Sequence, residues 1–581
     1  MSDNIKVMMS TEGTYPFHPG GVSTWCDILV KQLKGVDYVL YSLMMNPYVS
    51  QIYDLPTSTE LLKVPLWGTE EPSEHLDVPF SKVYLLKKRT TDEVVSKKFI
   101  PLFKSLILEL LSIEKNPQKL GNIFYELYLY FQDYEYKKSF KSEITWEQYK
   151  TIVNDFVDDA ENDIDTPSIY ALIQSLGWVY RFMVTLNTPV PKSDVTHSAA
   201  AAFCGIPCII AKIENKTPYM LTEHGVYIRE QYLSLSKRGY PSFLNTFFIR
   251  MINSIISVNY FYADIVSPVC KYNTRWEERF GVEKEKINVI YNGVDDTIFA
   301  PREAATKNTS PTVVSIARID PLKDIISLIE ATDIIRKEIP DIKMIVYGSV
   351  SVEEYYQECL KRVEKLDIKD NFIFAGHTDN VPAAYNSGDI IALSSISEAF
   401  PYSVVEAMMS GKPVVSTDVG GIKEAIGDCG ILVTPKSPEE LAAGIIKLLN
   451  DPEMIEDLGK RSRERAIIYF SIEKVLENHY NSYKGLMTAD TEIKKVLPIS
   501  LLQKQKFYAE KGYTLLNMGY TVEAIEQFKD AIASSPNTAL VPVLTLEIAN
   551  AYKKLGKTDK SKLEIEKSNA LLQLSSNTNQ T

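Results

Sequence analysis

The chain has 581 residues and a formal net charge of −12 at pH 7. This length is enough for about three or four domains. The acidic balance argues against a nucleic-acid partner, because phosphate backbones are bound by basic surfaces. The six cysteines are scattered, without the close pairs that bind metals, and this pattern is typical of a reducing cytoplasm.

No stretch of the sequence predicts a secretory signal or a membrane span. Residues 1–10 lead directly into an apolar strand, without the charged and then long apolar segments of a signal peptide. The longest apolar run, residues 199–211, is too short to cross a bilayer and contains Pro207. We therefore expect a cytoplasmic protein with no transmembrane segment of its own, brought to the inner face of the plasma membrane, if at all, by partners.

The first half begins with an apolar strand, Ile5–Met9, then a turn with Gly20 and Gly21, then a helix over about residues 22–33. This order is how a Rossmann-type unit begins, and the two glycines let a ligand approach the backbone closely. A turn in which only glycine fits explains the pair equally well. The GxGxxG fingerprint of dinucleotide-binding enzymes is missing, which argues against a dehydrogenase.

Long amphipathic helices are predicted over about residues 83–190. Apolar residues there fall at helical spacing among Lys, Glu and Tyr: Phe99, Leu102, Phe103, Leu106 and Leu110. This pattern predicts a helical insertion in the first half. Its aromatic side chains are expected in the core, with a platform for an acceptor as the alternative.

Two histidines follow predicted strands beyond the insertion. Residues 194–197 end a strand at His197, and the AAAAFCG that follows predicts a helix of small residues. Residues 219–222 predict the next strand, which delivers His224. Ligands of α/β proteins bind at the carboxyl ends of the strands, so this placement favours a binding role. The alternative is two buried structural histidines.

The second half begins at about Pro311, where TVVSIARIDPLKD predicts a strand and then a turn with Arg318 and Lys323. Two cations at the carboxyl end of a strand suit a diphosphate, because Arg offers a planar fork and Lys a point charge. An ordinary surface charge pair explains them equally well. Further strands are predicted at residues 342–346 and 371–376, each followed by a turn.

The most informative stretch is residues 394–416, SSISEAFPYSVVEAMMSGKPVVS. It predicts a turn, a short helix with Ser403 as its N-cap and Gly411 at its end, and a buried strand. Free N–H groups at such a helix start favour an anion. Glu398 and Glu406 are placed to accept hydrogen bonds from one polar ligand. The alternative is two solvated glutamates beside an ordinary buried helix.

The spacing of these glutamates, with Phe-Pro between them and GKPVVSTDVGG after them, resembles the E-x7-E signature of retaining glycosyltransferases of family 4. The resemblance covers about residues 1–487. It implies the GT-B fold, in which two Rossmann-like parallel-sheet domains face a cleft. It also implies that Glu398 contacts the transferred sugar and that Glu406 holds the ribose hydroxyls of the donor.

The same resemblance assigns roles to further residues. The histidine of the family's D-V-x-H element lies beside the donor sugar, and its R-x4-K pair binds the diphosphate. The implied catalytic residues are His197, Arg318, Lys323 and Glu398. The implied substrate-binding residues are Gly20, Gly21, His224, Tyr227, Arg229, Glu398, Phe400, Pro401, Tyr402, Ser403 and Glu406. The implied nucleotide-binding residues are Gly348, Gly376, His377, Val381 and Glu406. No metal and no cofactor are expected beside a UDP-sugar substrate.

Two longer motifs, EGTYPFHPGGVSTW and TEHGVYIRE, resemble the Pel exopolysaccharide glycosyltransferase (PelF) subfamily. This implies transfer of a hexose or N-acetylhexosamine from a UDP-sugar, with UDP-glucose or UDP-GalNAc as first candidates, to a growing exopolysaccharide. A glycogen-synthase-like glucosyltransferase is one alternative. Another is a catalytically silent nucleotide-binding scaffold that acts through C-terminal repeats. Residues 289–295 match the family's I-x-N-G-V-D element, for which we expect a structural role.

The C-terminal region has a different pattern. Small and large residues follow the tetratricopeptide spacing at Tyr508, Gly512, Leu515, Gly519, Ala524, Phe528, Ala531 and Pro536, with a weaker copy at Ala549, Tyr552, Leu555, Gly556 and Ile565. Two repeats are fewer than usually stand alone, so we expect them to pack on the enzyme or on protein partners of a membrane-bound polysaccharide synthase. The predicted domains are a first Rossmann-like acceptor-side domain (1–308), a nucleotide-sugar domain (309–469), a closing helix (470–487), a linker (488–500), tetratricopeptide-like repeats (501–574) and a disordered tail (575–581).

Overall fold

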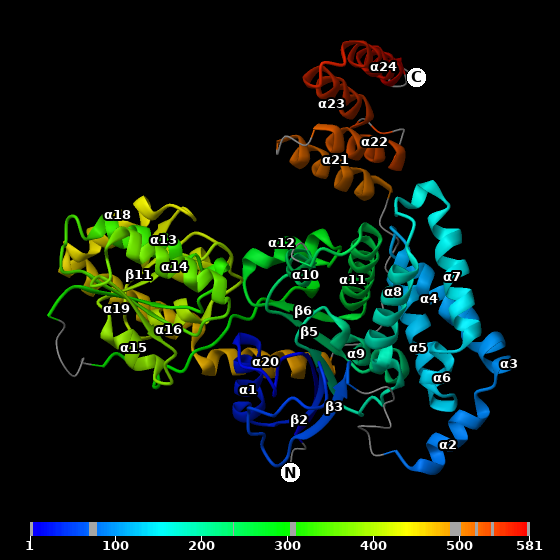
Figure 1. Ribbon diagram of the computed structural model, residues 1–581, viewed down its shortest axis with the longest axis horizontal. Coiled ribbons are helices and arrows are strands. Elements are labelled where there is room, and N and C mark those ends of the chain that lie inside the picture. The colour runs from blue at the N-terminus through cyan, green and yellow to red at the C-terminus, as the bar shows by residue number, and fades with distance from the viewer. Residues whose placement is uncertain are drawn as a thin grey trace. The chain divides into compact units, whose positions relative to one another are not determined.

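The structure, a computed structural model, describes residues 4–68, 78–235, 238–302, 309–488, 501–517, 521–535, 538 and 540–577. The chain divides into two compact units, Met1–Thr491 and Glu492–Thr581 (Figure 1). The first unit contains two six-stranded sheets and the second is helical. The predicted fold class, two Rossmann-like sheets followed by an all-α region, is confirmed.

The first sheet is parallel throughout, in the order β3-β2-β1-β4-β5-β6. Its strands are β1 (Ile5–Glu12), β2 (Val36–Met44), β3 (Glu60–Pro65), β4 (Val195–Ser198), β5 (Tyr219–Glu223) and β6 (Ile265–Pro268). Most of their residues are buried, as expected for a parallel sheet that is covered on both faces. The strand order reverses between β1 and β4, which makes this place the topological switch point.

Helices cover both faces of this sheet (Figure 1). Along β1, Val7 and Met9 face the helices α1 (Gly21–Gln32) and α20 (Ile472–Thr488), whereas Met8 faces the opposite core. The opposite face is covered by α9 (Ile206–Asn215) and α11 (Ser242–Tyr262). The last helix of the first unit therefore returns to the first sheet, where the sequence places the closing helix 470–487.

The second sheet repeats the topology, in the order β12-β11-β10-β7-β8-β9. Its strands are β7 (Thr312–Ile316), β8 (Lys343–Tyr347), β9 (Phe372–Gly376), β10 (Ile390–Leu393), β11 (Val414–Thr417) and β12 (Gly430–Val433). One face is covered by α13 (Ile325–Ile335), α14 (Glu353–Leu366) and α18 (Pro438–Leu449), and the other by α15 (Val381–Ser387), α16 (Tyr402–Met409) and α17 (Ile422–Ile426). Its switch point lies between the paired strands β7 and β10.

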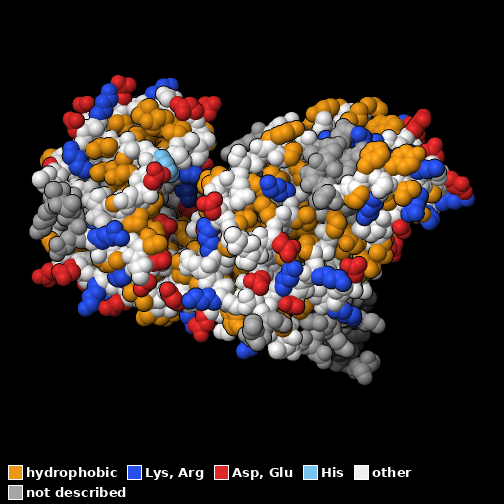
Figure 2. Space-filling model, turned by 90° about the horizontal axis from the view of Figure 1, so that it is seen from below, with side chains coloured by type: hydrophobic (Ala, Val, Ile, Leu, Met, Phe, Trp, Pro, Cys, Tyr) orange, Lys and Arg blue, Asp and Glu red, His pale blue; other side chains and the backbone are white. Residues whose placement is uncertain are grey.

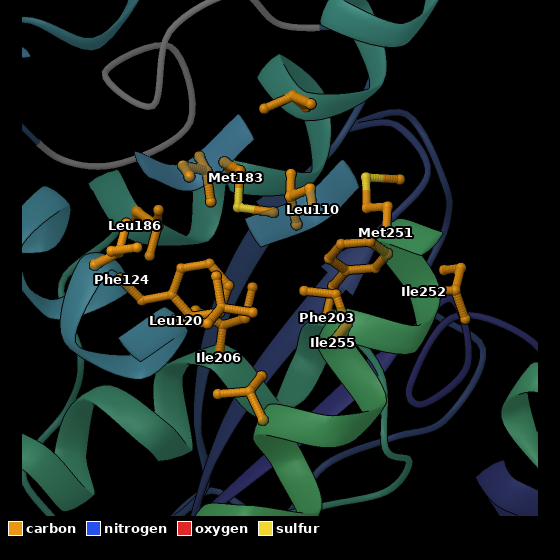
Figure 3. Packing of buried hydrophobic residues seen from close by; sticks show 14 of the residues in the cluster. Leu110, Leu120, Phe124, Met183, Leu186, Phe203, Ile206, Met251, Ile252 and Ile255 are labelled. Atoms are coloured by element: carbon orange, nitrogen blue, oxygen red, sulfur yellow. The ribbon is translucent and has the colours of Figure 1, made fainter. Parts of the chain in front are cut away.

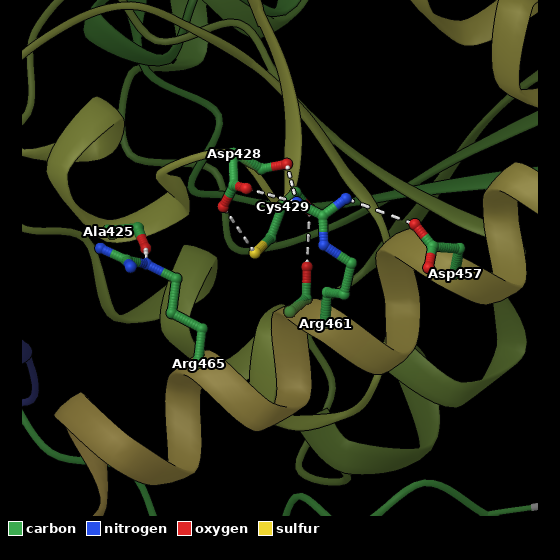
Figure 4. Close-up of polar contacts among 7 residues, drawn as sticks. Ala425, Asp428, Cys429, Asp457, Arg461 and Arg465 are labelled. Carbon is green, nitrogen blue, oxygen red and sulfur yellow. Dashed lines mark hydrogen bonds and ion pairs between the residues drawn. The ribbon is translucent and has the colours of Figure 1, made fainter.

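A long helix, α19 (Pro452–Phe470), connects the second sheet to α20. Arg461 on α19 pairs with Asp428 and Asp457, and Arg465 donates to the carbonyl of Ala425 (Figure 4). These contacts tie α19 to the turn between α17 and β12. The second sheet is thereby fixed to the helix that leads back to the first.

The insertion is helical, as predicted, and begins at α2 (Phe80–Arg89). It continues through α3 (Asp92–Val94), a π-helical turn at Val95–Phe99, α4 (Ile100–Leu111), α5 (Pro117–Asp133), α6 (Tyr136–Phe140), α7 (Glu143–Val157), α8 (Ile169–Phe182) and a 3-10 turn at Met183–Asn187. Leu110 and Phe124 of the insertion pack with Phe203 and Met251 from the helices of the sheet (Figure 3). The insertion thus shares one core with the first sheet.

Many aromatic side chains of the insertion belong to that core, although Phe80, Tyr84 and Tyr170 are exposed. The rings of Phe99 and Phe140 lie 5.1 Å apart, and those of Phe131 and Tyr136 lie 4.8 Å apart. All four side chains are buried. These four side chains therefore pack the insertion together.

Among the described residues, one helical stretch, Ile169–Asn187, has the length and apolar composition that could cross a membrane, and half of it is buried inside the fold. It includes α8, which packs in the same core as α11.

The helix predicted from AAAAFCG in the first unit is wrong: residues 199–202 are not helical, and α9 begins at Ile206. The N–H of Ala199 donates to the carbonyl of Ser10 at 2.9 Å, which extends the pairing of β4 with β1, and Pro207 then fits the first turn of α9. The six cysteines are all described, and each is buried and free.

The second unit contains four described helices, α21 (Leu501–Asn517), α22 (Thr521–Ser534), α23 (Leu540–Lys554) and α24 (Thr558–Asn577). A Cβ on Gly512 would lie 2.5 Å from the ring of Phe528, so α21 and α22 cross at the predicted pair of small and large residues. Gly519 and Pro536 lie outside the described residues. The tetratricopeptide-like assignment stays a prediction.

Three predicted boundaries fall partly outside the described residues: the end of the first domain at 308, the linker over 489–500 and the tail over 578–581. The tail prediction is wrong from Ser575 to Asn577, because α24 continues to Asn577.

Candidate functional site

The predicted donor-side residues lie on loops that follow neighbouring strands at the second switch point. Arg318 and Lys323 follow β7, and Glu398 follows β10. Since β7 and β10 pair in parallel, their carboxyl ends meet at the same edge of the sheet. This topology brings together residues that are 75 positions apart in the chain.

Lys323 and Glu398 form an ion pair at this edge. The distance between Lys323 Nζ and Glu398 Oε1 is 2.5 Å, and the two side chains are 20% and 11% exposed. Ser395 Oγ donates to the same carboxylate oxygen at 2.7 Å. The Glu398 side chain is therefore held in one orientation.

Arg318 is exposed on the same loop and has no ion-pair or hydrogen-bond partner among the described residues. Its guanidinium can therefore bind an anion without first breaking an internal contact. A planar fork of donors beside a lysine suits a phosphate.

The loop of Arg318 is held by a close approach at Gly348. A Cβ on Gly348 would lie 2.0 Å from the carbonyl oxygen of Ala317, so only glycine fits. The N–H of Gly348 donates to the carbonyl of Gly376 at 2.9 Å, which joins a third loop to this edge. His377 follows, with a side chain that is 70% exposed, and Val381 begins α15. The two glycines of this predicted nucleotide-binding set thus act through the backbone.

The turn that carries Glu398 is held by contacts with the Gly420–Gly421 turn and with Asn292. A Cβ on Gly420 would lie 1.9 Å from the carbonyl oxygen of Glu398, and the φ of 60° at Gly420 also favours glycine. The N–H of Gly421 donates to the carbonyl of Ala399 at 2.6 Å. From the first domain, Asn292 Nδ2 donates to the carbonyl of Phe400 at 3.1 Å. The I-x-N-G-V-D element therefore supports the turn.

Phe400 and Pro401 are predicted to bind substrate, but the structure places both in the interior. The ring of Phe400 is 4% exposed and packs against Tyr291 and Phe470 at 5.1 and 5.3 Å. Pro401 is buried as the residue before α16. Their side chains shape the turn and do not line the ligand side.

The start of α16 differs from the prediction. Pro401 occupies the N-cap position, and no side chain among the described residues caps this helix. Ser403 lies within the first turn, so its prediction as the N-cap is wrong; the fixed φ of proline sets an earlier start. The N–H of Val404 donates to the carbonyl of Pro401 at 3.3 Å, whereas those of Tyr402 and Ser403 have no acceptor among the described residues and are open to an anion. Gly411, with a φ of 68°, follows the helix end as predicted.

Glu406 lies in α16 and is half-buried. Tyr385 OH donates to Glu406 Oε2 at 2.8 Å and also lies 3.1 Å from the carbonyl of Ser403. Burial raises the pKa of Glu406 to about 7, although the hydrogen bond from Tyr385 lowers it in part. Tyr385 orients this carboxylate, and nothing in its local sequence marks it for that role.

The glycine turn after β1 meets α16. Gly20 has a φ of 152°, and a Cβ on Gly21 would lie 3.4 Å from the ring of Tyr402. Tyr402 packs against the cores of both sheets, and its hydroxyl has no hydrogen-bond partner among the described residues. Two predicted substrate-binding elements thus come together where the sheets meet. Figure 2 shows that the surface is hollowed between the lobes of the two sheets.

His197 lies in the core, contrary to its implied role beside the donor sugar. Its Nδ1 is 2.7 Å from Tyr483 OH, and its Nε2 is 2.8 Å from Thr222 Oγ1. Both ring nitrogens are therefore engaged, and burial holds the pKa of His197 well below its usual range. Because β4 continues to Ser198, His197 points from the face of the sheet toward α20 and not from its edge.

His224 is the predicted histidine with a free nitrogen. Its ring lies 4.7 Å from that of Trp25, and its Nε2 is buried without a hydrogen-bond partner among the described residues. Burial lowers the pKa of His224 to about 3, so the ring is neutral at physiological pH.

Glu12 is a site residue that the sequence interpretation missed. It ends β1, and its carboxylate accepts hydrogen bonds from Tyr227 OH at 3.2 Å and from the N–H of Cys204 at 3.1 Å. Burial raises the pKa of Glu12 to about 7. Tyr227, predicted to bind substrate, is thus engaged with Glu12, and Arg229 is exposed on the same helix, α10 (Tyr227–Leu235). The available signal was the acidic residue at the head of EGTYPFHPGG.

Comparison with known proteins gives two adjoining family matches. Residues 5–285 match the family described as Domain of unknown function (DUF3492), and residues 296–465 match Glycosyl transferases group 1. The trehalose synthase of Pyrococcus horikoshii is 31% identical over 185 residues, which are 30% of this chain and 44% of that protein. The chain spans about half the length of the first curated relatives it matches.

Two solved structures share the fold. Sucrose-phosphate synthase from Thermosynechococcus elongatus superposes with a TM-score of 0.53 at 16% identity, over 84% of this chain and 100% of that chain. The Anabaena protein Alr3699/HepE, in complex with UDP, superposes with a TM-score of 0.50 at 15% identity, over 83% of this chain and 100% of that chain. These likenesses show the GT-B fold, and the family match supports a group 1 glycosyltransferase.

Proposed function

We propose that this chain, a GT-B protein whose residues 296–465 match the group 1 glycosyl transferases, is a retaining glycosyltransferase. It moves a hexose or N-acetylhexosamine from a UDP-sugar, with UDP-glucose or UDP-GalNAc as first candidates, to a growing exopolysaccharide. The observation that carries the proposal is one sheet edge that combines the Lys323–Glu398 pair with Arg318 and the start of α16, neither of which has a side-chain partner among the described residues.

The two cations bind the diphosphate of the donor. As the bond between the sugar C1 and the diphosphate oxygen breaks, the diphosphate takes the electron pair, and Arg318, Lys323 and the first N–H groups of α16 stabilise the added charge. Such preorganised donors lower the barrier because they need no reorientation during the reaction. A new bond forms between C1 and the acceptor oxygen on the same face, and the acceptor proton passes to the leaving phosphate. No metal and no cofactor take part in this proposal.

The two glutamates have separate roles. Glu398, fixed by Lys323 and Ser395, accepts hydrogen bonds from hydroxyls of the transferred sugar. Glu406, oriented by Tyr385, accepts hydrogen bonds from the ribose hydroxyls. Charged acceptors make stronger hydrogen bonds to hydroxyls than neutral ones do.

UDP is chosen as the carrier because the Anabaena protein of the same fold is in complex with UDP. The resemblance of the EGTYPFHPGG and TEHGVYIRE motifs supports an exopolysaccharide as the acceptor. Six free cysteines and a sugar-nucleotide donor fit the cytoplasm. The helical second unit then binds protein partners of a membrane-bound polysaccharide synthase, as tetratricopeptide-like repeats do.

Calorimetry with UDP and single variants tests this assignment. Glu406→Ala should weaken UDP binding by about 1.5–3 kcal/mol, the range for hydrogen bonds to a charged group. Glu398→Gln should cost less UDP affinity than Glu406→Ala and should reduce sugar transfer, because Glu398 contacts the sugar and reaches the diphosphate only through Lys323. Equal losses of UDP affinity in the two variants would contradict the separate roles. A chain that binds UDP but transfers no sugar from any UDP-sugar would instead be a scaffold.

A further inference from the structure

We infer that α2, together with the basic segment that follows it, docks on an anionic lipid membrane. None of the ten described residues of α2 is buried, and only Val83 and Leu86 are half-buried. A helix that buries so little gains almost nothing from packing in this fold, although packing is what stabilises most protein helices. The inference rests on this surface alone and is independent of the proposed transfer reaction.

The exposed side of α2 is aromatic and apolar. Phe80, Tyr84 and Leu85 are 84%, 56% and 48% exposed. The rings of Phe80 and Tyr84 stack with centroids 6.4 Å apart, since residues four positions apart lie on one side of a helix. Single exposed apolar residues are ordinary on protein surfaces, but three on one short helix form a patch.

Positive charge surrounds this patch. Residues 80–104 contain seven Lys or Arg and two Asp or Glu, in a chain with a net charge of −12. In α2 itself, Lys82 lies in the first turn, Lys87, Lys88 and Arg89 form the last turn, and no residue is acidic. Of the two acidic residues, Glu93 is paired with Lys97 at 2.7 Å. The segment is thus complementary in charge to an anionic surface.

An exposed apolar face bordered by Lys and Arg is typical of helices that lie in a membrane interface. The apolar side chains enter the headgroup boundary, and the basic ones attract anionic headgroups. Figure 2 views the molecule from the side on which α2 lies in Figure 1, and hydrophobic and basic side chains stand next to each other there. A nucleic acid would match the charge but not the exposed apolar side chains.

The sequence before α2 carries opposite charge. Residues 69–77 contain four Asp or Glu and precede the end of α2 that lies away from Lys87, Lys88 and Arg89. The basic last turn, Lys87, Lys88 and Arg89, lies at the other end of this ten-residue helix from Phe80, about 15 Å away.

Co-sedimentation of the full chain with vesicles tests the inference. The chain should sediment with phosphatidylglycerol vesicles, less so at high salt, and not with phosphatidylcholine vesicles. Lys82→Gln with Lys88→Gln should weaken binding by about thirtyfold, the effect of two basic residues near an anionic surface. Phe80→Ser with Tyr84→Ser should weaken it by about tenfold or more, through lost apolar burial. Tyr84→Trp should retain binding and show blue-shifted emission when these vesicles are added.

Matched substitutions elsewhere serve as controls. Tyr48→Ser removes an aromatic ring that is 82% exposed outside α2, and Lys447→Gln with Lys460→Gln removes two exposed charges on the second sheet's helices. Both controls should bind the vesicles as the unaltered chain does, and every variant should keep its thermal midpoint.

Three results would overturn the inference. The chain could ignore phosphatidylglycerol vesicles while still binding UDP, which would leave the proposed function untouched. The α2 variants could bind as tightly as the controls. Membrane fractionation in cells could depend on α2 while the purified chain ignores lipid, which would assign the surface to a membrane protein.

Discussion

Lys323 and Glu398 depend on each other at the candidate site. Both side chains are largely buried, so the loss of either partner leaves an uncompensated charge. Single substitutions therefore report both a lost contact with the ligand and a changed partner. Arg318, which has no such partner among the described residues, is the cleaner probe of diphosphate binding.

Arg318→Ala should reduce turnover by about a hundredfold to a thousandfold, the range for removing one preorganised donor from a transition state. Its thermal midpoint should not change, because the side chain is exposed. Lys323→Ala should lose as much turnover and some stability. Arg461→Ala is the matched control, since this arginine is also partly exposed but pairs with Asp428 away from the site edge. Steady-state rates with the UDP-sugar measure the turnover of each variant. Normal turnover in Arg318→Ala would exclude a role for Arg318 in stabilising the leaving diphosphate.

Glu406 predicts a pH dependence. Its pKa rises from 4.5 to about 7 in the folded chain, so the folded state holds the proton more tightly and loses stability as the pH rises between these values. Ribose hydroxyls donate stronger hydrogen bonds to the deprotonated side chain of Glu406 than to its protonated form. UDP affinity should therefore increase by about tenfold from about pH 6 to about pH 8, as the deprotonated fraction rises from about one-tenth to about nine-tenths.

Glu406→Gln provides the control for that pH dependence. The amide keeps the shape of the side chain but does not titrate, so any remaining change with pH belongs to the phosphates of UDP. Calorimetry at both pH values compares the two proteins. Parallel pH profiles would show that Glu406 does not contact the ribose.

For single residues, the sequence predicts which charged side chains belong to the site better than it predicts where each side chain points. Lys323 and Glu398 were predicted as cation and carboxylate at strand ends, and the structure joins them. The sequence does not determine the direction of the His197 side chain. A strand that is one residue longer or shorter decides whether this side chain points from the edge of the sheet or from its face. Glu12 was missed because β1 was predicted to end at Met9, three residues early. Tyr385 reaches Glu406 through a tertiary contact that no local pattern reveals.

At the scale of elements, the site is held by close approaches between loops. Gly348 lies against Ala317, and Gly420 lies against the carbonyl of Glu398, in each case at a distance that forbids a Cβ. These contacts fix the end of β8 to that of β7, and the end of β11 to that of β10. They therefore position the backbone at Arg318 and Glu398, and the side chains of Lys323 and Ser395 then orient the Glu398 carboxylate.

Gly348→Ala should show that this approach matters. The new Cβ would lie 2.0 Å from a backbone oxygen, which can move only with its strand end. We expect a loss of about 1–3 kcal/mol in the free energy of unfolding, the scale of stored backbone strain, and a larger loss of turnover than of stability. Gly485→Ala on α20 is the control: no described atom lies within 4 Å of its Cβ position, so it should stabilise by about 0.5–1 kcal/mol. Chemical denaturation and turnover measure both variants.

The type of an element, helix or strand, follows from the local sequence where apolar residues recur at a regular spacing. The strands predicted at 194–197, 219–222, 342–346 and 371–376 match β4, β5, β8 and β9 to within one residue at each end, because apolar periodicity is a local property. The AAAAFCG segment failed, because a hydrogen bond to Ser10 in another strand overrides the helix propensity of alanine. The start of α16 failed because the rigid φ of Pro401 was not weighed against Ser403.

At the scale of the whole molecule, the chain closes on itself through α20. Tyr483 on this helix bonds His197, which is 286 positions earlier, and Val475 and Leu486 fill the core of the first sheet. The first domain is therefore incomplete without residues that follow the second. The strand order within each sheet could not be read from strand patterns alone; it was expected from the family resemblance.

The division into two units predicts that the second is dispensable for chemistry. A chain ending at Thr491 keeps α20 and should retain its UDP affinity, turnover and thermal midpoint. A chain ending at Phe470 lacks α20, exposes the core around Trp25 and should not fold. Calorimetry and turnover distinguish the two truncations.

If the second unit binds a membrane-bound synthase, the chain ending at Thr491 should also lose residual membrane co-fractionation in cells. This comparison is made in a chain that carries Lys82→Gln and Lys88→Gln, so that direct lipid binding does not mask the loss. If the second unit is instead a lid on the enzyme, removing it should lower the thermal midpoint or cause aggregation, and a truncated chain that still co-fractionates in that background argues against docking through the repeats.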